Sequence, residues 1–182
     1  MYKIDFFPEV SEEAKCLLLN IARIKEYKRK DYLLREGQVC KRLYFIQSGL
    51  LRTFYNNTGK DVNLHFATEG QFSTDIKSLR RQIPSELWIQ AYEPTTVLEF
   101  DANNLLSLYA RSEEIQEIGH RLMAQLHQEL LEHTDLINLL SPGDRYLYLQ
   151  RCRPDLVRRI SLTHLSSYIG ISRETLSRLK NP

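Results

Sequence analysis

Apolar residues recur at helical spacing over one long segment of the chain. Between Ser112 and Leu140 they are Ile115, Ile118, Leu122, Leu126, Leu130, Ile137 and Leu140. Steps of three, four or seven indicate an α-helix, and about 26 residues of helix would span 39 Å. So long an apolar stripe needs a partner to cover it. We expect a second copy of the chain to pair with it as in a coiled coil, and the alternative is that the helix packs on its own chain.

The segment before this stripe has the pattern of a small β-structure. From Tyr32 to about Phe100, short runs of Leu, Phe, Tyr and Val are punctuated by Gly37, Gly49, Gly59 and Gly70. The clearest hairpin is LLRTFYNNTGKDVNLHF, in which alternation resumes after the turn NNTGK. Such strands predict an antiparallel roll or barrel. Residues 8–27 are predicted to form a preceding helix, with Pro8 near its start and Ser11 as its N-cap.

Charge is distributed unevenly along a chain whose net charge is +2. From Arg145 to the end there are eight Lys or Arg and two Asp or Glu residues, so this segment carries +6 and residues 1–144 carry −4. A small basic segment suggests contact with a polyanion, most often nucleic acid, although a solvated surface explains the charge equally well. The stretch SPGDR at 141–145 ends the helical stripe and predicts a hinge and domain boundary.

Two short helical patterns lie close together near the end of the sequence. The first has one apolar face, made of Leu162, Leu165 and Ile169, with the small residue Ser166 between them. Gly170 ends this helix because glycine takes positive φ without strain. Three residues, GIS, then lead to a second helix for which Ser172 is a natural N-cap. This spacing is that of a helix-turn-helix.

The second of these helices has two unlike faces. At 100° per residue, one side carries Arg173, Glu174, Ser177 and Arg178, and the other carries Thr175, Leu176 and Leu179. Arginine binds guanine edges or phosphate bidentately, and glutamate accepts from cytosine, so the polar side has the chemistry to read base edges. The alternative is a solvated surface helix with Glu–Arg pairs at i, i+4, each worth only about 0.3–0.5 kcal/mol.

At these residues the chain resembles the Crp/Fnr family of bacterial transcription regulators. ISRETLSRLK is similar to the family's recognition helix, and YLLREGQVCKRLYFIQSGLLRTFY resembles the opening of its cyclic-nucleotide-binding β-roll. The resemblance covers nearly the whole chain and implies an α+β fold in three parts. Residues 1–111 would form an antiparallel sensor β-roll (a double-stranded β-helix) with flanking helices, 112–140 the dimerisation helix and 141–182 the helix-turn-helix domain.

The resemblance also implies a function and a set of partners. The protein would be a homodimer whose two recognition helices enter successive major grooves of a palindromic DNA site, about 34 Å apart. Base contacts are expected from Arg173, Glu174 and Arg178, and backbone contacts from Thr163, Ser172, Ser177 and Lys180. RNA polymerase and a small-molecule effector are further partners that the family implies. The family's β wing after the recognition helix is expected to be missing or short here.

The chain departs from the family where its members bind cyclic AMP. Those members resemble one another in a cassette that starts with Gly-Glu and ends with Arg-Ser or Arg-Thr. Here Gly70 is kept, Gln71 stands in place of the acid, and Ser85 and Glu86 stand in place of the final pair. A carboxylate at a phosphate subsite repels the phosphate. We therefore expect that a ligand pocket around these four residues does not bind cyclic AMP and that any effector is another molecule.

Metal centres and cofactors are not expected from the sequence. The three cysteines, Cys16, Cys40 and Cys152, have unrelated spacings and cannot reproduce a four-cysteine iron–sulfur site or a metal-binding pair. His120 and His127 are seven residues apart on the predicted helix, too far for one ion within one chain, so these two and His133 are interpreted as residues of the helix surface. No metal or other cofactor is therefore expected.

Other functional classes fit the sequence less well. An enzyme built on a β-roll would need a cluster of metal ligands along the strands, where the sequence offers only His65, so catalysis is not expected. The alternative to a DNA-binding regulator is a ligand-binding or protein-interaction module whose terminal helices bind a protein partner rather than DNA. Neither a signal peptide nor a run of apolar residues long enough to span a bilayer is evident, which favours a cytoplasmic protein.

Overall fold

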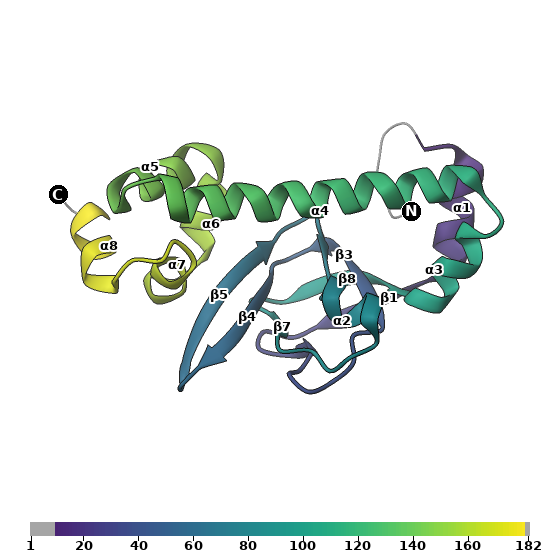
Figure 1. Cartoon of the computed structure of the whole chain (residues 1–182), viewed down its shortest axis with the longest axis horizontal. Coiled ribbons are helices and arrows are strands. Elements are labelled where there is room, and N and C mark those ends of the chain that lie inside the picture. Colours follow the sequence, from purple (N-terminus) through teal and green to yellow (C-terminus); the bar gives the residue numbers. More distant parts are fainter. Residues whose placement is uncertain (1–9, 181–182) are drawn as a thin grey trace. The chain divides into compact units, whose positions relative to one another are not determined.

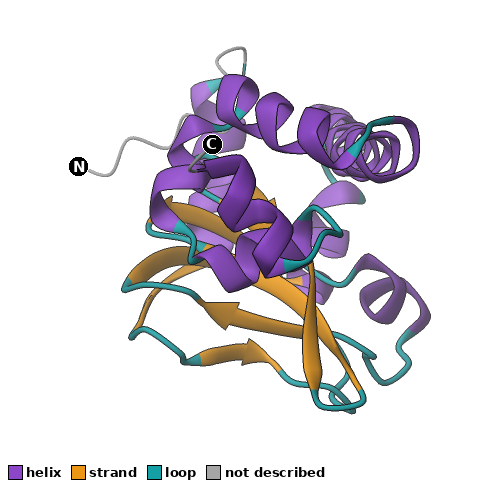
Figure 2. Ribbon diagram, turned by 90° about the vertical axis from the view of Figure 1, so that its left-hand side faces the viewer, coloured by secondary structure: helices purple, strands orange, loops and turns teal. Residues whose placement is uncertain are grey.

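The computed structural model describes residues 10–180, an α+β chain whose strands form two four-stranded sheets (Figures 1 and 2). The first sheet has the order β1 (Ala22–Tyr27), β8 (Thr95–Asp101), β3 (Arg42–Ser48), β6 (Phe72–Ser73). The second has the order β2 (Tyr32–Leu34), β7 (Trp88–Ala91), β4 (Leu51–Asn57), β5 (Lys60–Ala67). The predicted antiparallel roll is confirmed.

Apolar side chains from both sheets form the core of the roll. Buried members of this cluster include Tyr27, Tyr44, Ile46, Leu51, Ile89 and Val97. Buried and exposed residues do not alternate along most of β3 and β8, because several consecutive residues of each strand are buried. Those strands are central in their sheet, where both faces are covered.

The helix predicted over residues 8–27 is too long. Ser11 is its N-cap as expected, since its Oγ accepts from the Ala14 N–H at 3.1 Å, but α1 covers only Glu12–Ile21. Residues Ala22–Tyr27 form β1 instead, paired antiparallel with β8 from Ala22↔Phe100 to Tyr27↔Thr95. This long-range pairing overrides the local helical pattern. Pro8 lies outside the described residues.

The predicted hairpin is formed by β4 and β5. A two-residue loop joins the strands, and both of its residues have positive φ, 49° at Thr58 and 87° at Gly59. Positive φ at both positions is the requirement of a type I′ turn, whose twist matches that of paired strands. The Asn56 side chain supports the loop by accepting from the Gly59 N–H at 2.9 Å.

Short helices flank the strands, and a long helix follows them. Helix α2 (Ile76–Arg81) lies between β6 and β7, and α3 (Ala102–Tyr109) follows β8. The apolar stripe of the sequence forms α4 (Glu113–Leu139), within one residue of the predicted ends. None of the helices in residues 10–180 is long and apolar enough to span a membrane.

Four helices follow α4, of which the sequence analysis predicted two. The predicted pair is α7 (Leu162–Tyr168) and α8 (Arg173–Lys180); the others are α5 (Pro142–Cys152) and α6 (Pro154–Arg159). The stretch SPGDR does end α4, but it also starts α5, with Ser141 as N-cap and Pro142 in the first turn. Proline is well suited to a helix start because its missing N–H would have no helical partner.

The described residues divide into two compact units. Unit 1 contains the residues up to Thr53 together with Phe66–Ala124, and unit 2 contains Phe54–His65 together with the residues from Gln125 onward. Unit 2 therefore combines the tip of the β4–β5 hairpin with the C-terminal helices. Helix α4 contributes to both units.

Candidate nucleic-acid interface

The turn between α7 and α8 is closed by backbone hydrogen bonds. The Ile171 N–H donates to Ser166 O at 3.0 Å and the Gly170 N–H donates to Ser167 O at 3.3 Å. These two bonds are those of a Schellman motif, which requires positive φ after the helix. Gly170 has a φ of 65°, so the prediction that this glycine ends the first helix is confirmed.

Helix α8 is anchored by its apolar side. Ser172 caps it as predicted, because its Oγ accepts from the Thr175 N–H at 3.1 Å. Leu176 is fully buried, and Thr175 is half-buried beside it. Leu179 is 36% exposed, so the apolar side is less completely covered toward the end of the helix.

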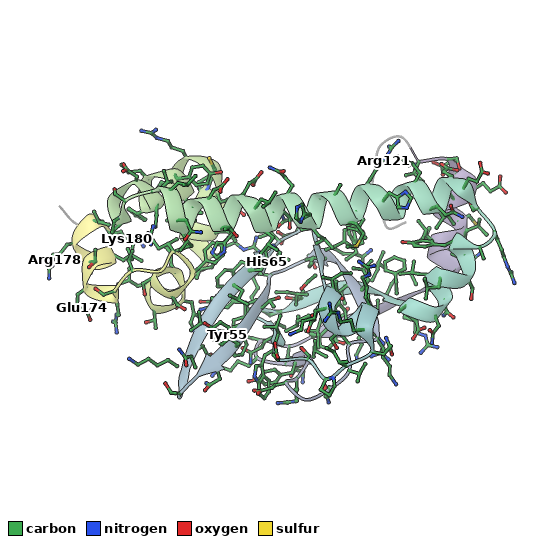
Figure 3. All side chains as sticks on the ribbon, in the orientation of Figure 1. Tyr55, His65, Arg121, Glu174, Arg178 and Lys180 are labelled. Atoms are coloured by element: carbon green, nitrogen blue, oxygen red, sulfur yellow. The ribbon has the colours of Figure 1, made fainter. Side chains whose placement is uncertain are left out.

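The opposite side of α8 is open to solvent. Exposed on it are Arg173, Glu174, Ser177, Arg178 and Lys180. Figure 3 shows Glu174 and Arg178 projecting outward from the helix. Thr163, on α7, and Ser172 are exposed as well. The structure therefore brings the seven candidate DNA-binding residues together on one helix-turn-helix.

Glu174 is held as a carboxylate at neutral pH. Hydrogen bonding from its own backbone N–H, and then from the Ser172 hydroxyl, lowers its pKa from the ordinary value, and Arg173 and Arg178 lower it further. An ionised carboxylate can only accept hydrogen bonds, while the two neighbouring guanidiniums can only donate. This exposed face can therefore bind both amino groups and acceptor atoms of a partner.

The hairpin tip contacts α7 within unit 2. The Ser167 hydroxyl accepts from the Asn63 N–H at 3.0 Å and donates to Asp61 O at 3.0 Å. The Asn63 amide also donates to His164 O at 3.4 Å, and Asn63 is buried. The Ser167 side chain therefore binds one backbone N–H and one backbone C=O of the edge strand β5. Sequence reasoning missed this contact because no local signal connects residues 104 positions apart.

A cleft of about 190 Å³ in unit 2 gathers several titratable side chains. It is lined by His65, Glu129, Glu132, His133, Leu136, Tyr148, Leu149, Cys152, Arg153 and Tyr168. His65 Nε2 lies 3.2 Å from Glu129 Oε2. The interpretation of the helix histidines as surface residues is correct for the exposed His120 and His127 and wrong for the half-buried His133.

His133 is packed against the end of α7. Its ring is stacked on Tyr168, with centroids 4.5 Å apart and an interplanar angle of 16°. Its Nε2 lies 2.8 Å from Tyr168 O, and because a carbonyl only accepts, Nε2 carries the proton. Burial lowers the pKa of His133 from its ordinary value, outweighing the raising effect of this hydrogen bond. Burial also raises the pKa of Tyr168 to about 12.

The four residues proposed to line a ligand pocket have partners of their own. The Gln71 Oε1 accepts from Thr68 N and Thr68 Oγ1, each at 3.0 Å. The Ser85 hydroxyl is buried and donates to Asp75 Oδ2 at 2.7 Å, and Glu86 is exposed and paired with Lys77 at 2.8 Å. Gly70 has a φ of 80° and donates to Ile46 O. None of these contacts joins the Gly70–Gln71 end to the Ser85–Glu86 end.

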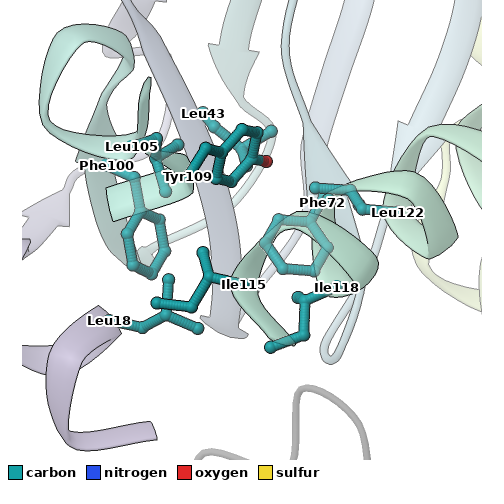
Figure 4. Close-up of a pocket in the computed structure, with 10 residues that line it drawn as sticks. Leu18, Leu43, Phe72, Phe100, Leu105, Tyr109, Ile115, Ile118 and Leu122 are labelled. Atoms are coloured by element: carbon teal, nitrogen blue, oxygen red, sulfur yellow. The ribbon is translucent and has the colours of Figure 1, made fainter. Parts of the chain in front are cut away.

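Unit 1 contains a small apolar cavity of about 30 Å³ between α4 and the roll (Figure 4). Its lining includes Phe72 and Phe100 from strands, Tyr109 from α3 and Ile115 and Leu122 from α4. The start of α4 therefore packs on its own chain. For this part of the helix, the apolar residues are covered without a second copy of the chain. By this measure the cavity has room for about two water molecules.

Metal ligands do not cluster in the part of the chain that the structure describes. Residues 10–180 contain no group of three or more His, Cys, Asp or Glu side chains able to hold a metal ion. All three cysteines are free, with Cys40 buried and Cys16 and Cys152 exposed.

Residues 24–112 match the family model of the cyclic nucleotide-binding domain. No curated protein shows significant similarity to the sequence. A crp/fnr-family regulator from Eubacterium rectale is 18% identical, with a TM-score of 0.73 over 96% of this chain and 85% of that one. A CooA double mutant from Carboxydothermus hydrogenoformans is 18% identical, with a TM-score of 0.74 over 98% and 83%.

A third solved structure is the global regulator CLP of Xanthomonas campestris, which is described as responsive to c-di-GMP. It is 17% identical, with a TM-score of 0.74 over 93% of this chain and 89% of that one. The chain therefore has the fold of the Crp/Fnr regulators, and its residues 24–112 match the cyclic nucleotide-binding domain. The fold expected from the sequence resemblance is confirmed.

We predict that His133 makes the stability of the protein depend on pH. Its pKa is depressed in the folded chain, so below its ordinary value of about 6.5 the unfolded chain takes up the proton first. The free energy of unfolding should therefore fall as pH decreases from 6.5 toward the folded pKa. Denaturant unfolding followed by circular dichroism between pH 8 and 5 measures this decrease.

His133→Gln should reduce that slope, because an amide can still donate to Tyr168 O and does not titrate. His127→Gln is the matched control, since it removes an exposed histidine from the same helix. Equal slopes for the wild type and the His133→Gln variant would contradict the prediction.

Proposed function

We propose that the protein is a sequence-specific DNA-binding transcription regulator that acts as a homodimer on palindromic DNA. The observation that carries the proposal is the form of α8, whose buried Leu176 fixes it to its unit while two guanidiniums and an ionised carboxylate are exposed on the other side. That combination suits a helix that enters a major groove. The shared fold of the Crp/Fnr regulators supports the proposal.

Within this proposal the exposed residues have different roles. Arg173, Glu174 and Arg178 read base edges, and Thr163, Ser177 and Lys180 bind the phosphate backbone. Ser172 has its hydroxyl engaged at the helix N-terminus, so its contribution to DNA binding is to orient the first turn of α8. The functional division is a sensor roll in 1–111, a dimerisation helix in 112–140 and a DNA-binding domain in 141–182.

Arg178→Ala should weaken binding to the preferred duplex by about 1–3 kcal/mol and relax the choice of base at one position. The preferred duplex comes from selection of a randomised pool with the ligand-free protein at two salt concentrations. Arg151→Ala is the control, because it removes the same charge from an exposed residue of α5. An equal loss of affinity on every duplex would mean that Arg178 contacts phosphate and does not read a base.

Binding to no duplex at either salt concentration would contradict the proposed function. Salt-sensitive binding without a motif would indicate that an effector is required or that the terminal helices bind a protein partner. Recovery of a palindrome would support both DNA reading and the two-fold symmetry of the bound protein.

The proposed homodimer forms through the part of α4 that its own chain leaves uncovered. Ile115 and Leu122 are buried, whereas Met123 is 37%, Leu130 61% and Leu131 44% exposed in the single chain. Three large apolar side chains within nine residues of one helix are costly to leave in water. A second copy of α4 offers the same apolar surface, as a two-fold interface requires.

Leu130→Glu should therefore raise the dimer dissociation constant by at least about 100-fold, because each dimer loses two buried leucines and gains two unpaired carboxylates. Sedimentation equilibrium measures this constant. Leu106→Glu is the control, since Leu106 is also 61% exposed but lies on α3. A dimer unaffected by Leu130→Glu would exclude this face of α4 as the interface.

The effector of the proposed regulator is not cyclic AMP. Two features support this part of the proposal: the Ser85 hydroxyl is already bound to Asp75, and Glu86 brings a carboxylate to the place of a phosphate ligand. Isothermal titration of cyclic AMP into the purified protein should give no saturable heat. Binding of cyclic AMP with low-micromolar affinity would contradict this part of the proposal.

A further inference from the structure

The carbonyl groups at the end of α7 each have a hydrogen-bond partner, and the partners differ in origin. Ser166 O and Ser167 O accept from the backbone of the turn itself. Tyr168 O accepts from His133 of α4, and the next two carbonyls accept from Arg145 of α5. Terminal carbonyls of a helix have no helical donor, so side chains of two other helices complete the turn.

Arg145 makes more of these contacts than any local capping group does. Its Nη1 donates to Ile169 O at 3.0 Å and to Gly170 O at 3.3 Å. Its Nε donates to Leu140 O, just beyond the end of α4, at 3.0 Å. One guanidinium therefore connects the end of α4, the start of α5 and the turn that leads into α8.

Gly170 faces this guanidinium directly. A Cβ placed on Gly170 would lie 3.3 Å from Arg145 Nη1 and 3.3 Å from Ile137 Cδ1. Glycine suits the positive φ of 65° at this position, and a Cβ there would displace the Arg145 guanidinium by a few tenths of an ångström. The position of Arg145 and the geometry of the turn depend on each other.

We propose that Arg145 is the positioning residue of the DNA-reading helix: by binding the carbonyls of the α7–α8 turn and of the α4 end, it fixes the direction in which α8 presents Arg173, Glu174 and Arg178. The inference rests on the proposed function and adds to it a residue that does not contact DNA. In the sequence, Arg145 is one of the eight basic residues of the terminal segment. Its guanidinium is instead half-buried and bound to three carbonyls.

Arginine is suited to this role by its shape. A guanidinium has five N–H donors in a rigid plane, so Nε and Nη1 can serve carbonyls from different segments at once. A lysine has the same charge but a single nitrogen at the end of a flexible chain. Arg145→Lys therefore keeps the charge and removes the fixed geometry, which separates a positioning role from a charge contact with phosphate.

The experiment compares the wild type, Arg145→Lys and the matched control Arg151→Lys, each as the full chain. For each, the dissociation constant is measured on the duplex selected by the wild type and on an unrelated duplex, at two salt concentrations. We expect Arg145→Lys to lower the ratio of specific to non-specific affinity about tenfold or more, with an unchanged salt dependence on the unrelated duplex. Arg151→Lys should change neither quantity.

A second measurement tests the same inference without DNA. Loss of the fixed turn should speed hydrogen exchange of the Ile171 amide, which donates to Ser166 O, in Arg145→Lys but not in Arg151→Lys. If the wild type binds no duplex, the proposed function fails, and the exchange rate of the Ile171 amide alone decides the positioning role. The exchange rate also decides it if the wild type binds DNA without selecting a sequence. An unchanged affinity ratio, or unchanged exchange of Ile171 in Arg145→Lys, would overturn the inference.

Discussion

The hydrogen bonding of the α7–α8 turn is the constraint on which the candidate interface depends. A turn that reverses the chain between two short helices has carbonyls that the helices cannot satisfy. The chain supplies donors from α4 and α5, through His133 and Arg145. Because α8 has only Leu176 fully buried, the direction of its exposed face follows from this turn more than from its own packing.

Hydrogen bonds from the β4–β5 hairpin reach the same helix-turn-helix. Ser167 lies on α7, and its hydroxyl bridges Asp61 O and the Asn63 N–H of the hairpin. Asp61 and Asn63 belong to the stretch that matches the cyclic nucleotide-binding domain. A segment of the proposed sensor is thus bound to α7 by these two bonds and by the bond from the Asn63 amide to His164 O, and all three must break if the hairpin moves away from that helix.

Local signals predicted those parts of the structure whose cause is local. Gly170 and Ser172 were identified correctly because positive φ and N-capping depend on residues within one turn. The helix end at Ile21 was missed because β1 is formed by pairing with residues 68 to 78 positions away. His133 and Arg145 were missed as parts of the site for the same reason, since their acceptors lie on another helix.

The charge of the terminal segment shows how composition can mislead about a surface. Eight basic residues from position 145 onward were taken together as a footprint for a polyanion. The structure separates them: Arg145 is bound to backbone carbonyls and Arg153 lies 3.9 Å from Asp155, whereas Arg173, Arg178 and Lys180 are exposed on α8. A guanidinium bound to carbonyls keeps its charge but has fewer donors left for a phosphate. The exposed charge of α8 is therefore a better measure of the proposed interface than the net charge of the segment.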